Sequence, residues 1–225
     1  MAISLHYIEM GDGFPLFLLH GNGEDGGYFS GQLRPFAEKH KVIAIDTRGH
    51  GNSPRGGAPF RLEQFADDLY RFMRKKGIER ADILGFSDGA NIAMIFAMTH
   101  PNRVRKLILN GGNIEPNGVK LSVLMKIKAE LAYYSFLSAF SKRYKSHVEM
   151  LRLMTDEPHI SPRELSKIKA PTLVLAGKDD LIKNSHTRLI ASKIQNSKLV
   201  FIDGNHFIAQ TNTKEYNRVV LEFLA

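Results

Sequence analysis

The stretch that decides the fold is Gly85-Phe86-Ser87-Asp88-Gly89, which lies between the apolar run 81–84 and a helical pattern that begins near Asn91. A serine turn between a strand and a helix is so tight that only glycine fits around the serine. The turn lifts the Ser87 hydroxyl out of the sheet and leaves the Asp88 backbone N–H able to bond an oxyanion. Because Gly-x-Ser-x-Gly also occurs by chance, its meaning depends on whether the chain supplies a base, an acid and a second oxyanion donor in order.

The composition is that of one globular domain. A length of 225 residues suits a single α/β domain, and 43% hydrophobic and 24% charged residues are close to average for soluble proteins. The longest apolar runs, such as 16–19 and 92–98, are far shorter than the roughly 20 residues that span a bilayer. No secretory signal is visible at the N-terminus, and the chain has no cysteine. We therefore expect a cytoplasmic protein without a membrane partner.

The formal net charge of +8 does not indicate nucleic-acid binding. Lys and Arg are scattered, and their densest cluster (Arg71, Arg74, Lys75 and Lys76) closes a predicted helix before Gly77. Cations in a last helical turn stabilise the helix dipole, so a structural role explains them. We expect no nucleic-acid partner.

Strand-like apolar runs alternate with helical patterns along most of the chain. Strands are expected at 3–9, 15–19, 42–45, 81–84, 104–109, 171–176 and 199–202, and helices near 28–40, 62–73, 91–100, 185–194 and 216–224. Repeated βα units predict an α/β fold whose mostly parallel, doubly wound sheet carries helices on both faces.

The alternation lapses between residues 114 and 168, where the pattern is helical and no strand-like run appears. We interpret this segment as a small helical cap inserted between two strands. The chain is then a single domain, with a core formed by residues 1–113 and 169–225.

Loops at the carboxyl ends of later strands supply the partners that a serine nucleophile needs. The strand at 171–176 is followed by Gly177-Lys178-Asp179-Asp180, and the strand at 199–202 by Asp203-Gly204-Asn205-His206-Phe207. Ser is a poor nucleophile at neutral pH and requires an adjacent base, which in turn requires an orienting group. The chain thus presents Ser87, then an Asp, then His206, which is a known order for this chemistry.

With these landmarks the whole chain resembles the α/β-hydrolase superfamily. His20-Gly21 resembles the family's oxyanion-loop motif, and residues 46–53 resemble its Asp-x-Arg-Gly-x-Gly-x-Ser loop. The family's acid and base patterns, Gly-x-x-Asp and Gly-x-His, map onto Asp180 and His206. The resemblance implies a nucleophile elbow at Ser87 and an oxyanion hole formed by the backbone N–H groups of Asn22 and Asp88.

The sequence departs from the family pattern in two respects. It begins just before what corresponds to the family's second strand, so the usual first edge strand is not seen. The cap, about 55 residues long by our boundaries, matches no particular subfamily.

Other residues compete for some of these roles. Asp179 is the alternative to Asp180, which the family spacing favours. Some family members carry the acid after the strand that ends here at Asn110, where this chain offers Asn110, Asn113 and Glu115. His20, His50 and His206 all follow predicted strands, but only His206 comes after the acid. No residue cluster has metal-ligand spacing and no phosphate-binding loop is present, so we expect no metal and no cofactor.

The resemblance implies a serine esterase of the carboxylesterase type, which cleaves a small-molecule ester through a catalytic triad of Ser87, His206 and Asp180 and an acyl-enzyme. Possible substrate contacts are His20, Gly21, Phe86, Asp88, Met125 and Phe207. Six apolar cap residues are candidates either for a roof over the acyl pocket or for plain packing of the cap onto the sheet: Leu121, Met125, Tyr133, Tyr134, Phe136 and Phe140.

Several functions remain open from the sequence alone. An acidic residue after the serine, here Asp88, resembles a subgroup that acts on amino-acid esters. The same triad serves cofactor-free haloperoxidases or perhydrolases and C–C bond hydrolases, and some proteins of the fold are non-enzymatic receptors. The sequence does not specify the physiological substrate or the oligomeric state.

Overall fold

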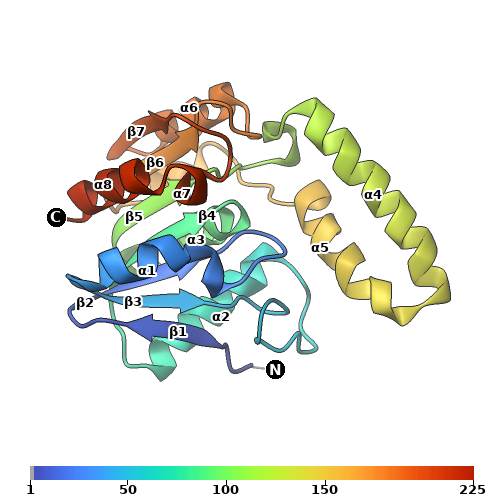
Figure 1. The fold of residues 1–225 in the computed structure, drawn as a ribbon, viewed down its shortest axis with the longest axis horizontal. Coiled ribbons are helices and arrows are strands. Elements are labelled where there is room, and N and C mark those ends of the chain that lie inside the picture. Colours follow the sequence, from blue (N-terminus) through green and yellow to red (C-terminus); the bar gives the residue numbers. More distant parts are fainter. Residues whose placement is uncertain (1–2) are drawn as a thin grey trace.

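The computed structural model describes residues 3–225 and contains one seven-stranded sheet flanked by helices (Figure 1). Its strand order is β1-β3-β2-β4-β5-β6-β7. The strands are β1 (Tyr7–Met10), β2 (Phe14–Leu19), β3 (His40–Ile45), β4 (Ala81–Phe86), β5 (Val104–Asn110), β6 (Thr172–Gly177) and β7 (Ser197–Ile202). Only β1 is antiparallel to its neighbour, and all other pairs are parallel. The predicted α/β class and mostly parallel sheet are confirmed.

The longer helices are α1 (Ser30–Ala37), α2 (Leu62–Lys75), α3 (Asp88–Thr99), α4 (Leu121–Phe140), α5 (Lys145–Asp156), α6 (Asn184–Lys193) and α8 (Thr213–Leu224). The four-residue α7 (Ile208–Thr211) and five 3₁₀ turns complete the structure: η1 (Gly26–Phe29), η2 (Pro101–Arg103), η3 (Pro116–Gly118), η4 (Lys142–Tyr144) and η5 (Glu164–Lys167). Two predicted boundaries were wrong. The first strand begins at Tyr7, not residue 3, and the helix expected over 28–40 is confined to α1 after a 3₁₀ turn.

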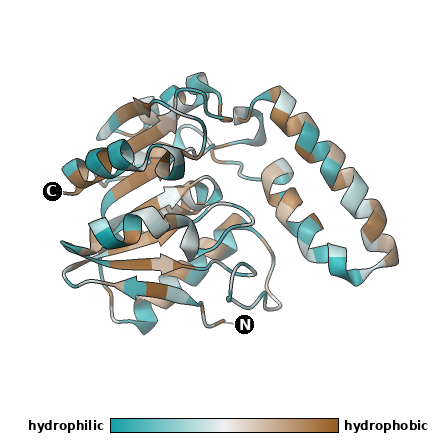
Figure 2. Cartoon of the chain, in the orientation of Figure 1, coloured by the Kyte–Doolittle hydropathy of each residue, from teal (hydrophilic) through white to brown (hydrophobic). Residues whose placement is uncertain are grey.

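Helices cover both faces of the sheet because alternate strand residues point to opposite sides. Phe17 and Leu19 of β2 pack with α2, α3 and α6, whereas Leu16 and Leu18 pack with α1, α7 and α8. All six residues of β4 are buried. A strand buried on both faces reads as a continuous apolar run, which is why the central strands were visible in the sequence (Figure 2).

Pro35 lies inside α1 and the helix continues through it. Proline has no N–H, so the carbonyl of Gly31, four residues earlier, loses its helical donor. The side-chain amide of Asn217 in α8 donates to that carbonyl at 2.9 Å. This contact between two distant segments supplies a donor for the carbonyl that the proline leaves without one.

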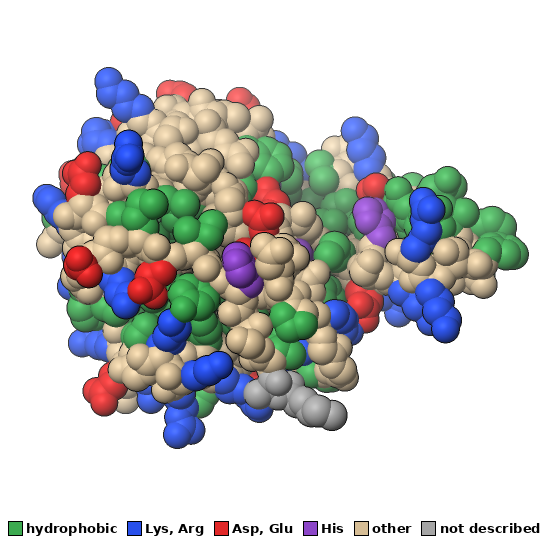
Figure 3. Space-filling model, turned by 60° about the horizontal axis from the view of Figure 1, so that its bottom comes forward, with side chains coloured by type: hydrophobic (Ala, Val, Ile, Leu, Met, Phe, Trp, Pro, Cys, Tyr) green, Lys and Arg blue, Asp and Glu red, His purple; other side chains and the backbone are tan. Residues whose placement is uncertain are grey.

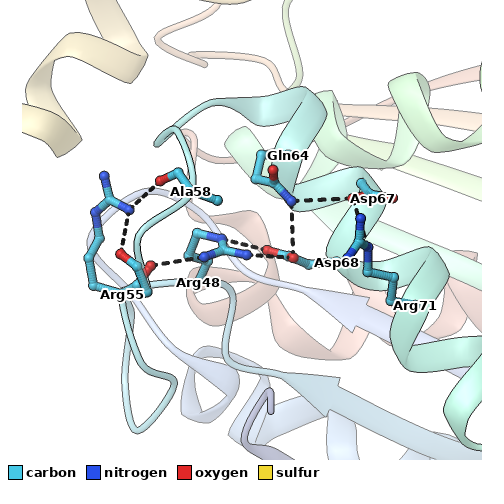
Figure 4. Close-up of polar contacts among 8 residues, drawn as sticks. Arg48, Arg55, Ala58, Gln64, Asp67, Asp68 and Arg71 are labelled. Atoms are coloured by element: carbon cyan, nitrogen blue, oxygen red, sulfur yellow. Dashed lines mark hydrogen bonds and ion pairs between the residues drawn. The ribbon is translucent and has the colours of Figure 1, made fainter. Parts of the chain in front are cut away.

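The loop 46–53 is held by buried polar contacts. The fully buried Arg48 makes a two-pronged ion pair with Asp68 of α2, at 2.7 Å from Nε and 2.6 Å from Nη2 (Figure 4). Ser53 Oγ donates to the Asp46 carbonyl at 2.6 Å, and the Asp46 carboxylate accepts the Gly26 N–H at 2.8 Å. These contacts give Asp46, Arg48 and Ser53 a structural role in holding the loop.

Helices α4 and α5 form an arm that stands away from the sheet (Figure 1). The arm lies within the segment 114–168 that we interpreted as a cap. Leu124 is the only buried residue of α4, so most of that helix lies outside the core. Among residues 3–225, no helix has both the length and the apolar character needed to cross a membrane.

Candidate active site

Ser87 occupies a strained turn between β4 and α3. Its φ of 54° and ψ of −119° make it the one non-glycine residue with positive φ in the described chain, 3–225. A Cβ on Gly85 would lie 2.2 Å from the Gly89 carbonyl oxygen, and one on Gly89 would lie 2.0 Å from that of Leu19. Both positions therefore require glycine. The strain at Ser87 is the kind that is stored at functional sites.

His206 and Asp180 form a buried pair at the carboxyl edge of the sheet. Nδ1 of His206 lies 2.7 Å from Oδ1 of Asp180, and both side chains are buried. The Asp180 carboxylate also accepts the N–H groups of Ile182 at 2.9 Å and Gly177 at 3.2 Å. Because Nδ1 is bound to Asp180, Nε2 is the ring atom that remains to accept a proton.

Gly111, just after β5, makes room for this pair. Its φ is +63°, and a Cβ there would lie 2.7 Å from Cε1 and 2.9 Å from Nδ1 of His206. The imidazole thus rests directly on the Gly111 backbone, which limits where the ring can lie.

His20 holds the oxyanion loop from beneath. Its Nε2 accepts the Thr47 N–H at 3.0 Å, so the proton lies on Nδ1, which donates to the Gly21 carbonyl at 2.7 Å. Burial lowers the pKa of His20 to about 4, which keeps the ring neutral. The Gly21 carbonyl and the Asn22 N–H belong to one peptide group, so His20 orients the candidate oxyanion donor.

The side chain of Asn22 binds that of Asp88. Its Nδ2 donates to Asp88 Oδ2 at 2.9 Å and also to the Met150 carbonyl of α5 at 2.9 Å. Burial raises the pKa of Asp88, which receives a second amide donor from Asn91. Asp88 is the first residue of α3, and the N–H groups in the first turn of a helix have no intrahelical acceptor. Asn22 therefore links the oxyanion loop, the Ser87 turn and the arm.

These residues surround a cavity of about 170 Å³. Most of its apolar wall comes from the start of the arm, α5 and the loop after Asp180, and most of its polar lining comes from the sheet edge. The lining residues are Gly21, Asn22, Glu24, Phe86, Ser87, Asp88, Asn113, Val119, Val123, Ile127, Met154, Glu157, Leu181, Ile182, His206 and Phe207.

Two carboxylates of this lining, Glu24 and Glu157, were missed in the sequence. Glu24 accepts the Gly21 N–H at 3.1 Å, and burial raises its pKa to about 7. Glu157, just after α5, accepts the Leu62 N–H at 2.8 Å and pairs with Arg61 at 3.0 Å. Glu24 could have been noticed as an acid on a loop at the carboxyl edge of the sheet. Nothing local marks Glu157, because only the path of the arm brings it here.

Four of the six predicted substrate contacts line the cavity, namely Gly21, Phe86, Asp88 and Phe207. His20 does not, because its ring lies beneath the loop with an exposure of 1%. Met125 does not either, because it lies on the outer face of α4 and is 59% exposed.

None of the apolar cap residues considered as a roof lines the cavity, because they lie on the outer or distal part of the arm: Leu121, Met125, Tyr133, Tyr134, Phe136 and Phe140. The inner face of the first turns of α4 takes that place with Val123 and Ile127.

The competing acids are placed differently. Asp179 is exposed, whereas Asp180 has no exposed surface and contacts His206. Asn110 and Asn113 carry amides where an alternative acid would lie, and the Asn113 side chain is bound to Asn91 and to the Glu115 carbonyl. Within residues 3–225, no three His, Cys, Asp or Glu side chains are arranged to hold a metal ion.

A larger cavity, of about 680 Å³, lies between the N-terminal segment and α2 and is lined by Tyr7, Tyr70, Arg71 and neighbouring residues. It contains neither Ser87 nor His206. The smaller cavity carries the chemically competent groups and is the candidate active site.

Comparison with known proteins identifies the family of the chain. Residues 15–129 match the family model described as alpha/beta hydrolase fold. The chain is 28% identical to the 2-hydroxy-6-oxononadienedioate/2-hydroxy-6-oxononatrienedioate hydrolase 2 of Pseudomonas putida, covering 100% of this chain and 92% of that protein. It is 27% identical to the mouse (Mus musculus) serine hydrolase BPHL, with coverages of 99% and 84%.

Among solved structures, Est816, described as an N-acyl homoserine lactone degrading enzyme, superposes with a TM-score of 0.80 at 25% identity. The match covers 98% of this chain and 97% of that one. The family model matches more than half of this chain, including most of β2, all of β3 to β5 and the Ser87 turn. The chain therefore belongs to the alpha/beta hydrolase fold family.

Proposed function

We propose that this hydrolase cleaves a carboxylic ester, or a related acyl bond, of a small molecule without a cofactor. His206 accepts the Ser87 proton through Nε2, and Ser87 attacks the carbonyl carbon. The N–H groups of Asn22 and Asp88 stabilise the oxyanion, a contribution of about 3 to 4 kcal/mol per donor in such sites. Asp180 keeps the proton on His206 Nδ1 and stabilises the imidazolium. His206 gives its proton to the alcohol leaving group as the ester C–O bond breaks and the acyl-enzyme forms. Water then attacks the acyl-enzyme with His206 again as base, which releases the acid and restores Ser87.

One observation carries the proposal. The buried His206–Asp180 pair, 2.7 Å apart, lines or supports the same cavity as the strained Ser87 turn. A base oriented by a buried acid, in the same cavity as a half-buried serine, is the arrangement that activates a hydroxyl.

The relatives support acyl chemistry. The name of Est816 refers to a lactone, which is a cyclic ester, and BPHL is named a serine hydrolase. The Pseudomonas putida relative is named for a dienedioate, a substrate with two carboxylates. No Lys or Arg of residues 3–225 lines the cavity, while Glu24, Asp88 and Glu157 do. Recognition of carboxylates usually takes cationic donors, so this lining favours an ester over a dienedioate.

A panel of p-nitrophenyl esters from acetate to palmitate tests the proposal. The cavity is smaller than the roughly 300 to 1,000 Å³ of typical ligand pockets, so kcat/KM should be highest for acetate or butyrate. Ser87→Ala should reduce turnover by at least about 10³-fold while the thermal unfolding midpoint changes little. Wild-type turnover in Ser87→Ala would overturn the assignment.

The carboxylate lining favours a second candidate, an ester with a cationic amino group. Glu24, Asp88 and Glu157 provide acceptors around the cavity. The Asp88 carboxyl is already bound by Asn22, which leaves Glu24 as the more available partner. Comparing kcat/KM for α-amino esters and their des-amino analogues decides between the two candidates. A preference below twofold removes the amino-ester candidate.

Peroxide-dependent halogenation, C–C bond hydrolysis and a receptor role use the same residues and are separable by assay. Bromination of monochlorodimedone with peroxide identifies the first, and loss of dienone absorbance the second. Very slow ester turnover with tight ligand binding would indicate a receptor. A cytoplasmic location and the lack of nucleic-acid and membrane partners remain predictions.

A further inference from the structure

The outer face of α4 is an exposed apolar stripe. Leu121, Met125, Ala129, Ala132, Phe136 and Phe140 are all exposed and follow one another at helical spacings of four or three residues. Residues at these spacings lie on one side of a helix. Figure 1 shows α4 as the outermost element of the arm, with α5 on its inner side. No element within residues 3–225 covers this face.

The stripe is large for a surface that remains in water. Leu121, Met125, Phe136 and Phe140 are 59% to 76% exposed, and the adjoining Tyr133 is 59% exposed. An aromatic side chain has roughly 150 to 250 Å² of surface, so the exposed apolar area reaches several hundred Å². On monomers, contiguous patches of that size mark interaction sites. Figure 3 shows hydrophobic side chains on the protruding arm, with Lys and Arg side chains beside them.

The order of residues along the stripe is two-fold symmetric. It reads large, large, small, small, large, large, and its centre lies between Ala129 and Ala132. An antiparallel copy of the same helix therefore places Leu121 against Phe140 and Met125 against Phe136 at both ends. The two alanines meet at the centre, where small side chains allow the helix backbones to approach closely.

We propose that the protein forms a two-fold symmetric dimer in which α4 packs antiparallel on α4 of a second copy. A two-fold interface requires that each residue meet its counterpart reciprocally, which the stripe satisfies. This proposal does not depend on the function proposed above.

The charges beside the stripe agree with the antiparallel arrangement. Lys126 and Lys128 flank the apolar face. In an antiparallel pair Lys128 lies opposite Tyr133 of the partner subunit, where an ammonium group can contact an aromatic ring. A parallel pair would instead place Lys128 against the same lysine of the other copy. A lipid surface, by contrast, does not require the two-fold order of the side chains.

Sedimentation equilibrium of the full chain tests the association. We expect a dimer, and Phe136→Glu should weaken it at least 100-fold, because two carboxylates would be buried against apolar partners. Ser146→Glu, on the exposed surface of α5, adds the same charge to the arm away from the stripe and should leave the dimer intact. Thermal unfolding of both variants shows whether the fold is retained.

Cysteine cross-linking tests the register, since the natural chain has no cysteine. Met125→Cys and Phe136→Cys should form a disulfide dimer when the two variants are mixed and oxidised. Each variant alone should not, because 11 residues of helix, about 16 Å, then separate the two thiols. Cross-linking of each variant alone would overturn the antiparallel register.

A monomeric chain at a concentration on the order of 100 μM would overturn the dimer. Binding of that monomer to phosphatidylglycerol vesicles, abolished by Phe136→Glu, would assign the stripe to an anionic lipid surface instead. A monomeric chain and vesicle binding are both measured independently of the proposed function, whose failure would appear as a lack of ester turnover.

Discussion

The side-chain amide of Asn22 donates to the carboxylate of Asp88 at 2.9 Å, and these are the two residues whose backbone N–H groups form the candidate oxyanion hole. A single side-chain contact thus fixes the distance between the two loops that carry the donors. The second bond of Asn22, to the Met150 carbonyl at 2.9 Å, extends the link to α5. Oxyanion donors are effective when they are held in place before the charge develops.

We expect Asn22→Ala to lower kcat about 10-fold with a smaller change in KM. The variant keeps the backbone N–H but removes a hydrogen bond to a buried carboxyl group, a loss of about 1.5 to 3 kcal/mol. Steady-state kinetics with p-nitrophenyl acetate measure the effect. Asn102→Ala, at an exposed asparagine of η2, is the control. A change in KM alone would show that Asn22 contacts the substrate and does not position the donors.

Asp180→Asn should lower kcat about 10⁴-fold, because an amide at this position favours the wrong His206 tautomer. The neighbouring Asp179→Asn is a close control, since Asp179 is exposed and Asp180 is buried against His206. Equal losses in the two variants would contradict the assigned acid.

Gly111→Ala should abolish most activity by displacing the His206 ring, which lies 2.7 Å from the position of the new Cβ. Gly77→Ala provides a matched control, because Gly77 also has positive φ, +67°, but has no atom within 4 Å of an added Cβ. Both variants should lose about 1 kcal/mol of stability from backbone strain. Only Gly111→Ala should lose activity, and similar kinetics in the two would refute the role of this contact.

His20→Asn should change how stability depends on pH. The folded-state pKa of His20 is lowered from 6.5 to about 4 by burial, so the unfolded chain binds more protons between these values. In the wild type, the contribution of His20 to the free energy of unfolding is complete above about pH 6.5. It falls by about 2 to 4 kcal/mol as the pH drops toward 4. Urea unfolding at several pH values should show a smaller fall in His20→Asn. The exposed His159→Asn is the control.

Glu24→Gln should change the pH dependence of stability in the direction opposite to that of His20→Asn. Burial raises the folded-state pKa of Glu24 from 4.5 to about 7, so the folded chain retains a proton that the unfolded chain releases. Stability therefore falls as the pH rises from about 4.5 to 7, by about 1 to 2 kcal/mol after allowing for partial exposure. Above pH 7 the variant should be more stable than the wild type in urea unfolding. Glu38→Gln, at an exposed glutamate, should show no such gain.

The sequence determined the features that depend on local chemistry. Gly85 and Gly89 bracket Ser87 because any Cβ there would collide with backbone, and such collisions restrict the sequence itself. The central strands were visible because burial on both faces demands continuous apolar runs. The order of Ser87, Asp180 and His206 followed from loops that end parallel strands at one edge.

Only the tertiary structure decided what surrounds these residues. Met154 and Glu157 reach the cavity because α5 and the residue after it run back toward the sheet, and no local sequence pattern predicts that path. Met125 was assigned to the pocket and lies instead on the outer face of α4. The sequence of a helix does not distinguish an apolar side chain that faces a cavity from one that faces solvent. The direction it faces depends on the packing of distant segments, which is why the chemistry was predictable and the substrate contacts were not.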